Sequence, residues 1–339
     1  MTAPLRLTRK QILAFLRSVG ALDQRLPPGR RSLRQAAWAG LQDSMPRAAL
    51  LSIHARVDGA GPAVWDDPSL VQVRGPRYQV YVVAERDLAV FTFSRLPGAG
   101  KIRQRADDLA PRLHELLGGE RMRYGDAGHA LGVHGNMLRY AALTGRLAIR
   151  WEGARQPLVW TVPPPTIAQT EATLELARRF LRIFGPAGPE AFGKWAGIGA
   201  REAVRAFDQL GGELIQVSTP IGEKSLLAVD EPVIRETPVP AAAARLLPSG
   251  DAFTLHGTSD DRALLVPDAA QRAELWTPRV WPGALLVAGE LAGTWRRAQR
   301  TMTIQAWRKL SRVAREAVVA EAESLPLPDA GNGMTVQWV

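Results

Sequence analysis

The sequence predicts an α+β protein in which repeated helix-and-hairpin units precede a small C-terminal β-rich domain. Three observations lead to this prediction. The chain has 339 residues, of which 46% are hydrophobic and 22% charged, enough for two or three folded domains. Sliding the sequence against itself by 67 residues aligns residues 109–118 with residues 176–185. A proline-rich linker at residues 232–240 then separates these units from shorter strand-like runs.

The N-terminal unit is predicted over residues 1–103. Thr8 is a candidate N-cap for a helix that turns Ile12 and Phe15 to one face and Arg9 and Arg17 to the other. The other expected elements of this unit are helices at residues 34–41 and 47–57 and strands at residues 71–73, 79–83 and 89–93. We interpret the unit as a diverged copy of the repeated plan.

Residues 104–166 and residues 167–232 are predicted to be the two clearest copies. Each begins with an amphipathic helix closed by a glycine and continues with two shorter helices. The strand-like runs that follow are expected at residues 147–151, 158–162, 214–217 and 225–229. Three helices followed by a hairpin describe a winged helix, the variant of helix-turn-helix that places a helix in the DNA major groove. Winged helices also serve as protein–protein scaffolds, which is the alternative.

The last part of the chain, residues 241–339, is predicted to be the β-rich domain with one closing helix. Its expected elements are strands at residues 262–266, 284–287, 291–295 and 301–306 and a helix at residues 309–322.

Arginine dominates the positive charge. The chain has 43 basic and 33 acidic residues, a net charge of +10, and all but five of the basic residues are arginines. Residues 291–315 contain no acid, and residues 25–56 contain only Asp43. The guanidinium fork suits phosphate, so we expect double-stranded DNA as the partner. The expected DNA-binding residues are Arg34, Arg47, Arg56, Arg296, Arg297, Arg300 and Arg308. A GC-rich genome also raises arginine content, which is the alternative explanation of the composition alone.

Several functional classes are excluded or unsupported. Cysteine is absent, which excludes disulfides, thiolate metal sites and a cysteine nucleophile. A phosphate-binding loop near residues 96–102 lacks its first glycine and its hydroxyl residue. We therefore expect no metal, no cofactor and no nucleotide. The chain starts without an apolar segment of signal-peptide length, so we expect a cytoplasmic, nucleoid-associated monomer that does not enter membranes.

Residues 38–56, the two later units, residues 245–251 and residues 289–297 resemble the AlkZ/YcaQ-like family of winged-helix DNA glycosylases. The resemblance covers nearly the whole chain. It implies tandem winged helices and a C-terminal β domain curved around duplex DNA. Some members of the family excise bulky N7-alkylated purines and unhook interstrand crosslinks without a metal or cofactor. The function implied is a monofunctional DNA glycosylase, and the alternative is a non-catalytic winged-helix DNA-binding protein that acts as a regulator or lesion binder.

The resemblance also implies a catalytic motif. Gln42-Asp43-Ser44 stands where the family has Gln-x-Gln or Gln-x-Asp, whose side chains hold and polarise the attacking water. Gln42, Asp43 and Ser44 are therefore the candidate catalytic residues. The third position carries only a hydroxyl, and Tyr81 stands where relatives often have histidine. Because adjacent residues point in different directions, Asp43 is out of register with the family's carboxylate. The alternative is that Asp43 or Ser44 caps the helix expected to begin near Pro46.

Overall fold

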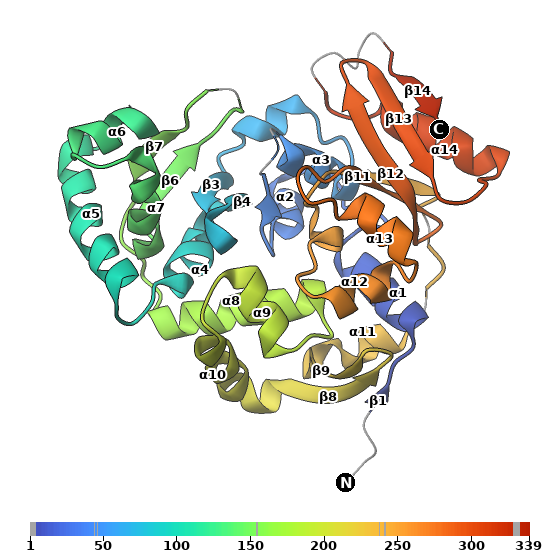
Figure 1. The fold of residues 1–339 in the computed structure, drawn as a ribbon, viewed down its shortest axis with the longest axis horizontal. Coiled ribbons are helices and arrows are strands. Elements are labelled where there is room, and N and C mark those ends of the chain that lie inside the picture. The colour runs from blue at the N-terminus through green and yellow to red at the C-terminus, as the bar shows by residue number, and fades with distance from the viewer. Residues whose placement is uncertain are drawn as a thin grey trace.

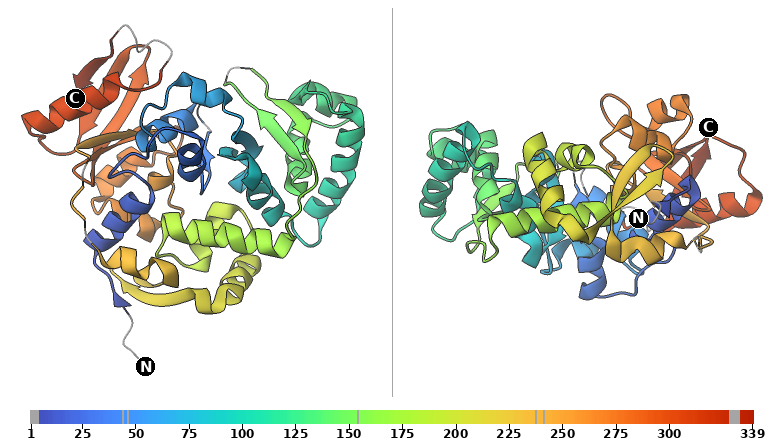
Figure 2. Two further views of the ribbon diagram at one scale, coloured as in Figure 1. Left: turned by 180° about the vertical axis from the view of Figure 1, so that it is seen from behind. Right: turned by 90° about the horizontal axis from the view of Figure 1, so that it is seen from below.

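The computed structural model describes residues 5–43, 45, 47–153, 155–236, 238–240, 242–327 and 333–339. Within these residues the fold is mixed α+β with three sheets. The helices of the second unit lie at one side of the molecule and the C-terminal strands at the other, with the N-terminal unit between them (Figure 1). Seen from below, the molecule is thinner than in the view of Figure 1 (Figure 2). None of the described helices is long and apolar enough to span a membrane.

A six-stranded sheet joins the first and second units. Its strand order is β2-β4-β3-β6-β7-β5. The strands are β2 (Leu41–Gln42), β3 (Leu70–Arg74), β4 (Val80–Ala84), β5 (Met122–Arg123), β6 (Leu147–Arg150) and β7 (Leu158–Thr161). Strand β3 pairs antiparallel with β4 on one side and with β6 on the other, where Gln72 lies opposite Ile149. The β6–β7 hairpin is therefore hydrogen-bonded into the same sheet as β2, and the domain boundary at residue 103 stays a prediction.

The helices of this part of the chain follow the apolar pattern of the sequence. They are α1 (Arg9–Val19), α2 (Arg30–Ala36), α3 (Ala48–Arg56), α4 (Leu88–Thr92), α5 (Lys101–Leu117), α6 (Tyr124–Ala130) and α7 (Leu138–Ala141). Helix α1 begins with a capping box made by Thr8 and Gln11, and it buries Ile12 and Phe15 as expected. Arg17 differs from the prediction, because it is buried and pairs with Asp23 at 2.8 Å.

The third unit consists of three helices and a hairpin. These elements are α8 (Gln169–Phe184), α9 (Pro189–Ala196), α10 (Ala200–Leu210), β8 (Leu214–Thr219) and β9 (Gly222–Leu227). Strand β1 (Leu5–Arg6), from the start of the chain, adds to this hairpin and pairs parallel with β8. Both later units thus have the predicted order of helices and strands, and their identity as winged helices stays a prediction.

The C-terminal region forms the third sheet, with strand order β10-β11-β12-β13-β14. Its strands are β10 (Ala244–Leu247), β11 (Gly283–Val287), β12 (Glu290–Ala298), β13 (Thr301–Ala306) and β14 (Thr335–Trp338). Its helices are α12 (Ser259–Leu265), α13 (Ala269–Leu275) and α14 (Arg312–Glu323), and α11 (Glu231–Arg235) precedes them. Helix α14 packs against β10. The five-stranded sheet confirms a β-rich C-terminal region.

Two predicted strands are helical. Of the predicted strand at residues 89–93, all but Phe93 lies in α4, because both sides of β4 are already occupied by β2 and β3 and no neighbouring strand position is open there. Short, fully buried apolar runs do not distinguish strand from helix by their periodicity. Residues 262–266 lie mostly in α12, whose N-cap Thr258 accepts a hydrogen bond from the backbone of Asp261. The acidic first turn of α12 is the helix signal that the strand prediction overlooked.

The helix predicted at residues 34–41 lies earlier in the chain. Helix α2 begins at Arg30 and ends at Ala36, and Leu41 belongs to β2, where it lies opposite Val82. Gly40, with a φ of +74°, separates the two elements, and an added Cβ there would meet the ring of Phe91 at 2.7 Å. The chain therefore leaves the helix early, and this places Gln42 on a strand.

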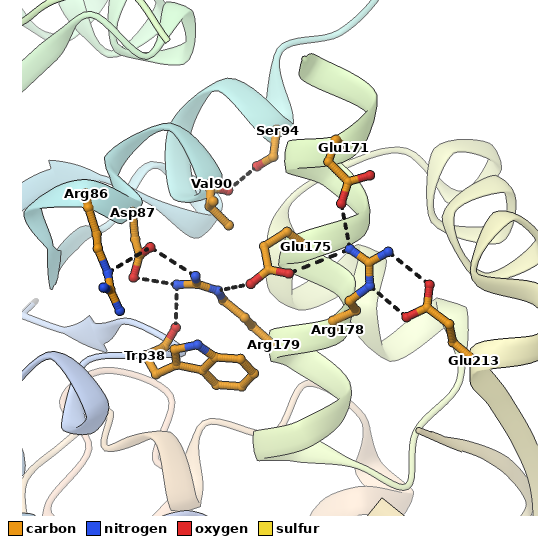
Figure 3. Close-up of polar contacts among 10 residues, drawn as sticks. All are labelled: Trp38, Arg86, Asp87, Val90, Ser94, Glu171, Glu175, Arg178, Arg179 and Glu213. Atoms are coloured by element: carbon orange, nitrogen blue, oxygen red, sulfur yellow. Dashed lines mark hydrogen bonds and ion pairs between the residues drawn. The ribbon is translucent and has the colours of Figure 1, made fainter. Parts of the chain in front are cut away.

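Helix α8 is held to the first unit by a charged network (Figure 3). Arg179 is buried and pairs with Asp87 at 2.8 Å and with Glu175 at 2.8 Å. Its Nη1 also donates to the carbonyl of Trp38, whose ring lies under the guanidinium. The neighbouring Arg178 faces the other way and pairs with Glu171 and Glu213. The network ties the third unit to the segment that leads into β2.

Candidate active site

Gln42 lies at the edge of the six-stranded sheet and lines a cavity. It is half-buried, and it faces Tyr81 in the register of β2 and β4. Its Oε1 accepts hydrogen bonds from Nη2 of Arg77 at 3.2 Å and from the hydroxyl of Tyr81 at 3.4 Å. Burial raises the pKa of Tyr81 to about 12, so its hydroxyl stays a donor. These two donors orient the amide of Gln42.

The cavity beside Gln42 has a volume of about 380 Å³. Its lining includes Gln42, Arg77, Gln79, Ser249, Arg279 and Trp281. The guanidinium of Arg262 lies 5.3 Å from the centre of the Trp281 ring. Arg77, Arg262 and Arg279 form no ion pair among the described residues, which makes the cavity cationic. Such a setting suits the phosphate groups of a polyanion.

Gly250 completes the wall next to Gln42. Its φ is +74°, in the left-handed region that glycine adopts readily, and an added Cβ would lie 3.0 Å from Nε2 of Gln42. Gly250 belongs to residues 245–251, one of the segments in which the sequence resembles a glycosylase family. Gln42 is therefore close to a segment that follows it by about two hundred residues in the chain.

Asp43 points away from the cavity. Its side chain is fully buried, and its Oδ1 accepts a hydrogen bond from the backbone of Ala49 in the first turn of α3. Its Oδ2 accepts from Nε2 of Gln72 at 2.8 Å. Asp43 thus stabilises the start of α3, as the capping alternative predicts, although it stands several residues before the helix. Its geometry favours capping over contact with a ligand in the cavity.

Gln72 connects Asp43 to the hairpin of the second unit. Its Nε2 donates to Asp43, and its Oε1 accepts from the backbone of Trp151, just after β6, at 2.6 Å. Sequence reasoning missed this residue, because a single glutamine in a strand carries no signal of its partners. The contact links the segment next to Gln42 with the β6–β7 hairpin.

Burial raises the pKa of Asp43 to about 7, although the hydrogen bonds from Ala49 and Gln72 favour its carboxylate form. A carboxyl whose pKa is higher in the folded than in the unfolded protein stabilises the fold at acidic pH, and it loses that contribution as the pH rises through the folded pKa. Relative to wild type, Asp43→Asn should therefore gain stability from about pH 4 to pH 7, by at most about 1.4 kcal/mol per pH unit. Urea denaturation across this range measures the difference.

Comparison with wild type is needed because other buried groups also titrate; burial lowers the pKa of His54 to about 4, for example. Asp208→Asn, at an exposed position on α10, is the matched control. Its free energy of unfolding should differ from that of the wild type by the same amount at every pH. The same flat difference for Asp43→Asn would mean that Asp43 is ionised in the folded protein throughout.

The remaining candidate residues fall into three groups. Ser44 lies outside the described residues. Arg56, expected to contact DNA, is instead buried and pairs with Asp251 at 2.7 Å, so that prediction is wrong. Its donors are used inside the protein because Asp251 is fully buried. Arg34 and Arg47 are half-buried, while Arg296, Arg297, Arg300 and Arg308 are exposed, and these six stay predictions. Nη2 of Arg296 donates to the carbonyl of Val280, which lines the cavity.

The titratable groups in the described part of the chain show no arrangement suited to a metal. No cluster of three or more histidine, aspartate or glutamate side chains that could hold an ion occurs among the described residues. The chemistry available at the cavity is therefore that of an oriented amide, a tyrosine hydroxyl and several guanidinium groups.

Comparison with known proteins gives two results. A family model described as DNA glycosylase AlkZ-like matches residues 36–326. The DNA glycosylase AlkZ of Streptomyces sahachiroi has a similar fold, with a TM-score of 0.80 and 16% sequence identity over 99% of this chain and 100% of that one. No individually curated protein matches the sequence.

Proposed function

The chain belongs to the AlkZ-like DNA glycosylase family, and from this premise we propose that it binds double-stranded DNA and hydrolyses the N-glycosidic bond of a bulky N7-alkylated purine. Family membership implies a role in DNA repair. The observation that supports the activity is the position of Gln42, whose amide is oriented at the edge of a cavity with arginines that can hold the phosphates on either side of the lesion. Unhooking of an interstrand crosslink is the same reaction on a lesion that joins the two strands.

Hydrolysis of the glycosidic bond of an N7-alkylated purine needs little catalytic help from the protein. Alkylation at N7 makes the purine a cationic leaving group, so the glycosidic bond is already weak and needs no strong general acid. What remains is to stabilise an oxocarbenium-like sugar and to align a water molecule. The two hydrogen bonds to Oε1 of Gln42 are long, at 3.2 and 3.4 Å. A water molecule can replace one of these donors and be held by the amide for attack on the anomeric carbon.

Asp43 gives specific support to the alternative function. In the family, the motif supplies two polar groups, and in this chain the only carboxylate of the motif is buried against α3. A winged-helix DNA-binding protein that recognises lesions without excising them would need the scaffold and the arginines, but not a second polar group. The two functions therefore predict the same DNA binding and different chemistry.

Incubation of the purified protein with a duplex that contains a single N7-alkylguanine separates the two functions. Abasic sites are revealed by strand cleavage in alkali and scored against an enzyme-free sample, because alkylated purines also depurinate spontaneously. The glycosylase hypothesis expects abasic sites to form faster with the protein than without it. A protein that binds the duplex and leaves the rate of depurination unchanged, with several bulky N7 adducts, would support the non-catalytic function.

A further inference from the structure

Arginines and tyrosines gather between the first and second units. The guanidinium of Arg105, on α5, lies 5.3 Å from the centre of the Tyr140 ring, and that of Arg139, on α7, lies 4.9 Å from it. Arg139 also lies 5.3 Å from the ring of Tyr78, which meets Tyr140 edge-on at 5.8 Å. We call Tyr78, Arg105, Arg139 and Tyr140 the arginine–tyrosine cluster.

The cluster lacks a compensating negative charge. Among the described residues neither Arg105 nor Arg139 forms an ion pair, and Nε of Arg139 is buried without a hydrogen-bond partner. Other arginines of α5 are neutralised, since Arg103 pairs with Asp107 and Arg112 pairs with Asp108. A phosphate group from outside the protein would supply the missing counter-charge.

One further arginine at the edge of the cluster serves the structure. Arg95 lies over Tyr78 and is buried, and its Nε donates to the carbonyl of Ala196. Burial lowers the pKa of Arg95 to about 10, which is still high enough to keep it charged at neutral pH. Arg95 adds positive charge beneath Tyr78 without exposing a donor, so the accessible donors are those of Arg105 and Arg139.

We propose that the arginine–tyrosine cluster is a binding site for a backbone phosphate group of duplex DNA, and that Arg105 and Arg139 supply its donors. This inference rests on the proposed function, because it takes DNA as the ligand. A guanidinium stacked on an aromatic ring keeps its N–H groups at its edge, where they can form paired hydrogen bonds with phosphate oxygens. Arg105 is exposed, so a phosphate can approach from solvent. The hydroxyl of Tyr140 accepts from Nη2 of Arg139 at 2.9 Å and fixes the second guanidinium.

A short turn connects this site to Gln42. Arg77 and Tyr78, at residues 76–78 between β3 and β4, both have left-handed backbones with φ of +54° and +60°. This conformation is costly for residues other than glycine, and it sends successive side chains in different directions. Arg77 reaches Gln42, whereas Tyr78 packs in the cluster. A duplex held by the cluster would thus lie along the same face as the cavity.

The experiment compares two double variants by the salt dependence of their affinity for a fluorescent, undamaged duplex. Arg105→Gln with Arg139→Gln removes two charges from the cluster, and Arg103→Gln with Arg112→Gln removes two charges that are already neutralised on α5. Each phosphate contact contributes about 0.9 to the slope of log K against log salt concentration. Because the cluster holds one phosphate, the cluster variant should have a slope lower by about 0.9 and bind about tenfold or more weakly at low salt, while the control pair stays near wild type.

Arg139 is half-buried, so its replacement can disturb the fold. The single variant Arg105→Gln avoids this, and it should lower the slope by up to about 0.9 at an unchanged melting temperature. Equal losses in the cluster and control variants, an unchanged slope, or a wild type that does not bind DNA would overturn the proposal. Excision is scored separately. If the wild type binds DNA through the cluster but excises no lesion, only the proposed function is contradicted. If the wild type excises and the salt slope of the variants is unchanged, only the proposed role of the cluster is contradicted.

Discussion

Replacing Gln42 by alanine is expected to reduce the rate of excision of an N7-alkylguanine by about 10² to 10³-fold. The amide is the polar group of the motif that lines the cavity, and its orientation is set by Arg77 and Tyr81. Its removal takes away the group proposed to align water, but it leaves the arginines predicted to contact DNA in place. Single-turnover kinetics with excess protein measure the chemical step, and fluorescence anisotropy should show that the affinity for the duplex changes little.

The control for Gln42→Ala is Gln271→Ala, which removes a glutamine from α13 away from the lining of the cavity. It should leave both excision and binding at the wild-type level. Excision by Gln42→Ala at the wild-type rate would exclude the amide from the chemistry and return attention to the segment around Ser44.

Replacing Arg56 by alanine is expected to destabilise the protein by about 3 to 5 kcal/mol. Arg56, on α3, donates to both carboxylate oxygens of Asp251, at 2.7 and 2.8 Å, and Ser52 donates to the same carboxylate at 2.6 Å. Burial by itself would raise the pKa of Asp251, yet Arg56 and these hydrogen bonds hold it below its usual value. Without Arg56 a buried carboxylate loses its counter-charge. Urea denaturation monitored by tryptophan fluorescence measures the loss.

Two further variants test this explanation. Arg308→Ala removes an exposed arginine and should change the free energy of unfolding by less than about 0.5 kcal/mol. Arg56→Met combined with Asp251→Leu removes both charges and should recover much of the stability lost in Arg56→Ala. Wild-type stability of Arg56→Ala together with weaker DNA binding would restore Arg56 as a DNA contact.

Local patterns in the sequence predicted many of the elements. The amphipathic spacing of Ile12 and Phe15 and the cap at Thr8 located α1, and alternation located β3 and β4 within one or two residues. The pairing of β3 with β6 was not predictable, because strand partners so far apart in the chain leave no local signal. The same limit explains α4, whose apolar residues fit either a strand or a helix until the neighbours of β4 are known.

The limit of prediction from sequence is clearest for the charged residues of the candidate site. A basic stretch suggested a solvent-exposed surface, but Arg56 is buried against Asp251, which follows it by 195 residues. Asp43 was predicted either to act in catalysis or to cap a helix, and its environment, set by Ala49 and Gln72, favours capping. By contrast, the arginine–tyrosine cluster combines residues from three separate segments, and no local pattern indicates that they meet. The partner of a charged side chain decides its role, and that partner is rarely close in the chain.

The six-stranded sheet that joins the first two units fixes the distance between its strands. Strands lie about 4.8 Å apart, so β2, which carries Gln42, and β6, three positions away, are held roughly 14 Å from each other. No hinge between them can open without breaking the hydrogen bonds of β3. A duplex that contacts both the hairpin and the cavity must therefore adapt its own shape to the protein. Flexible or already kinked DNA adapts at a lower cost than stiff DNA, so under the proposed function the stiffness of the duplex around a lesion would contribute to its recognition.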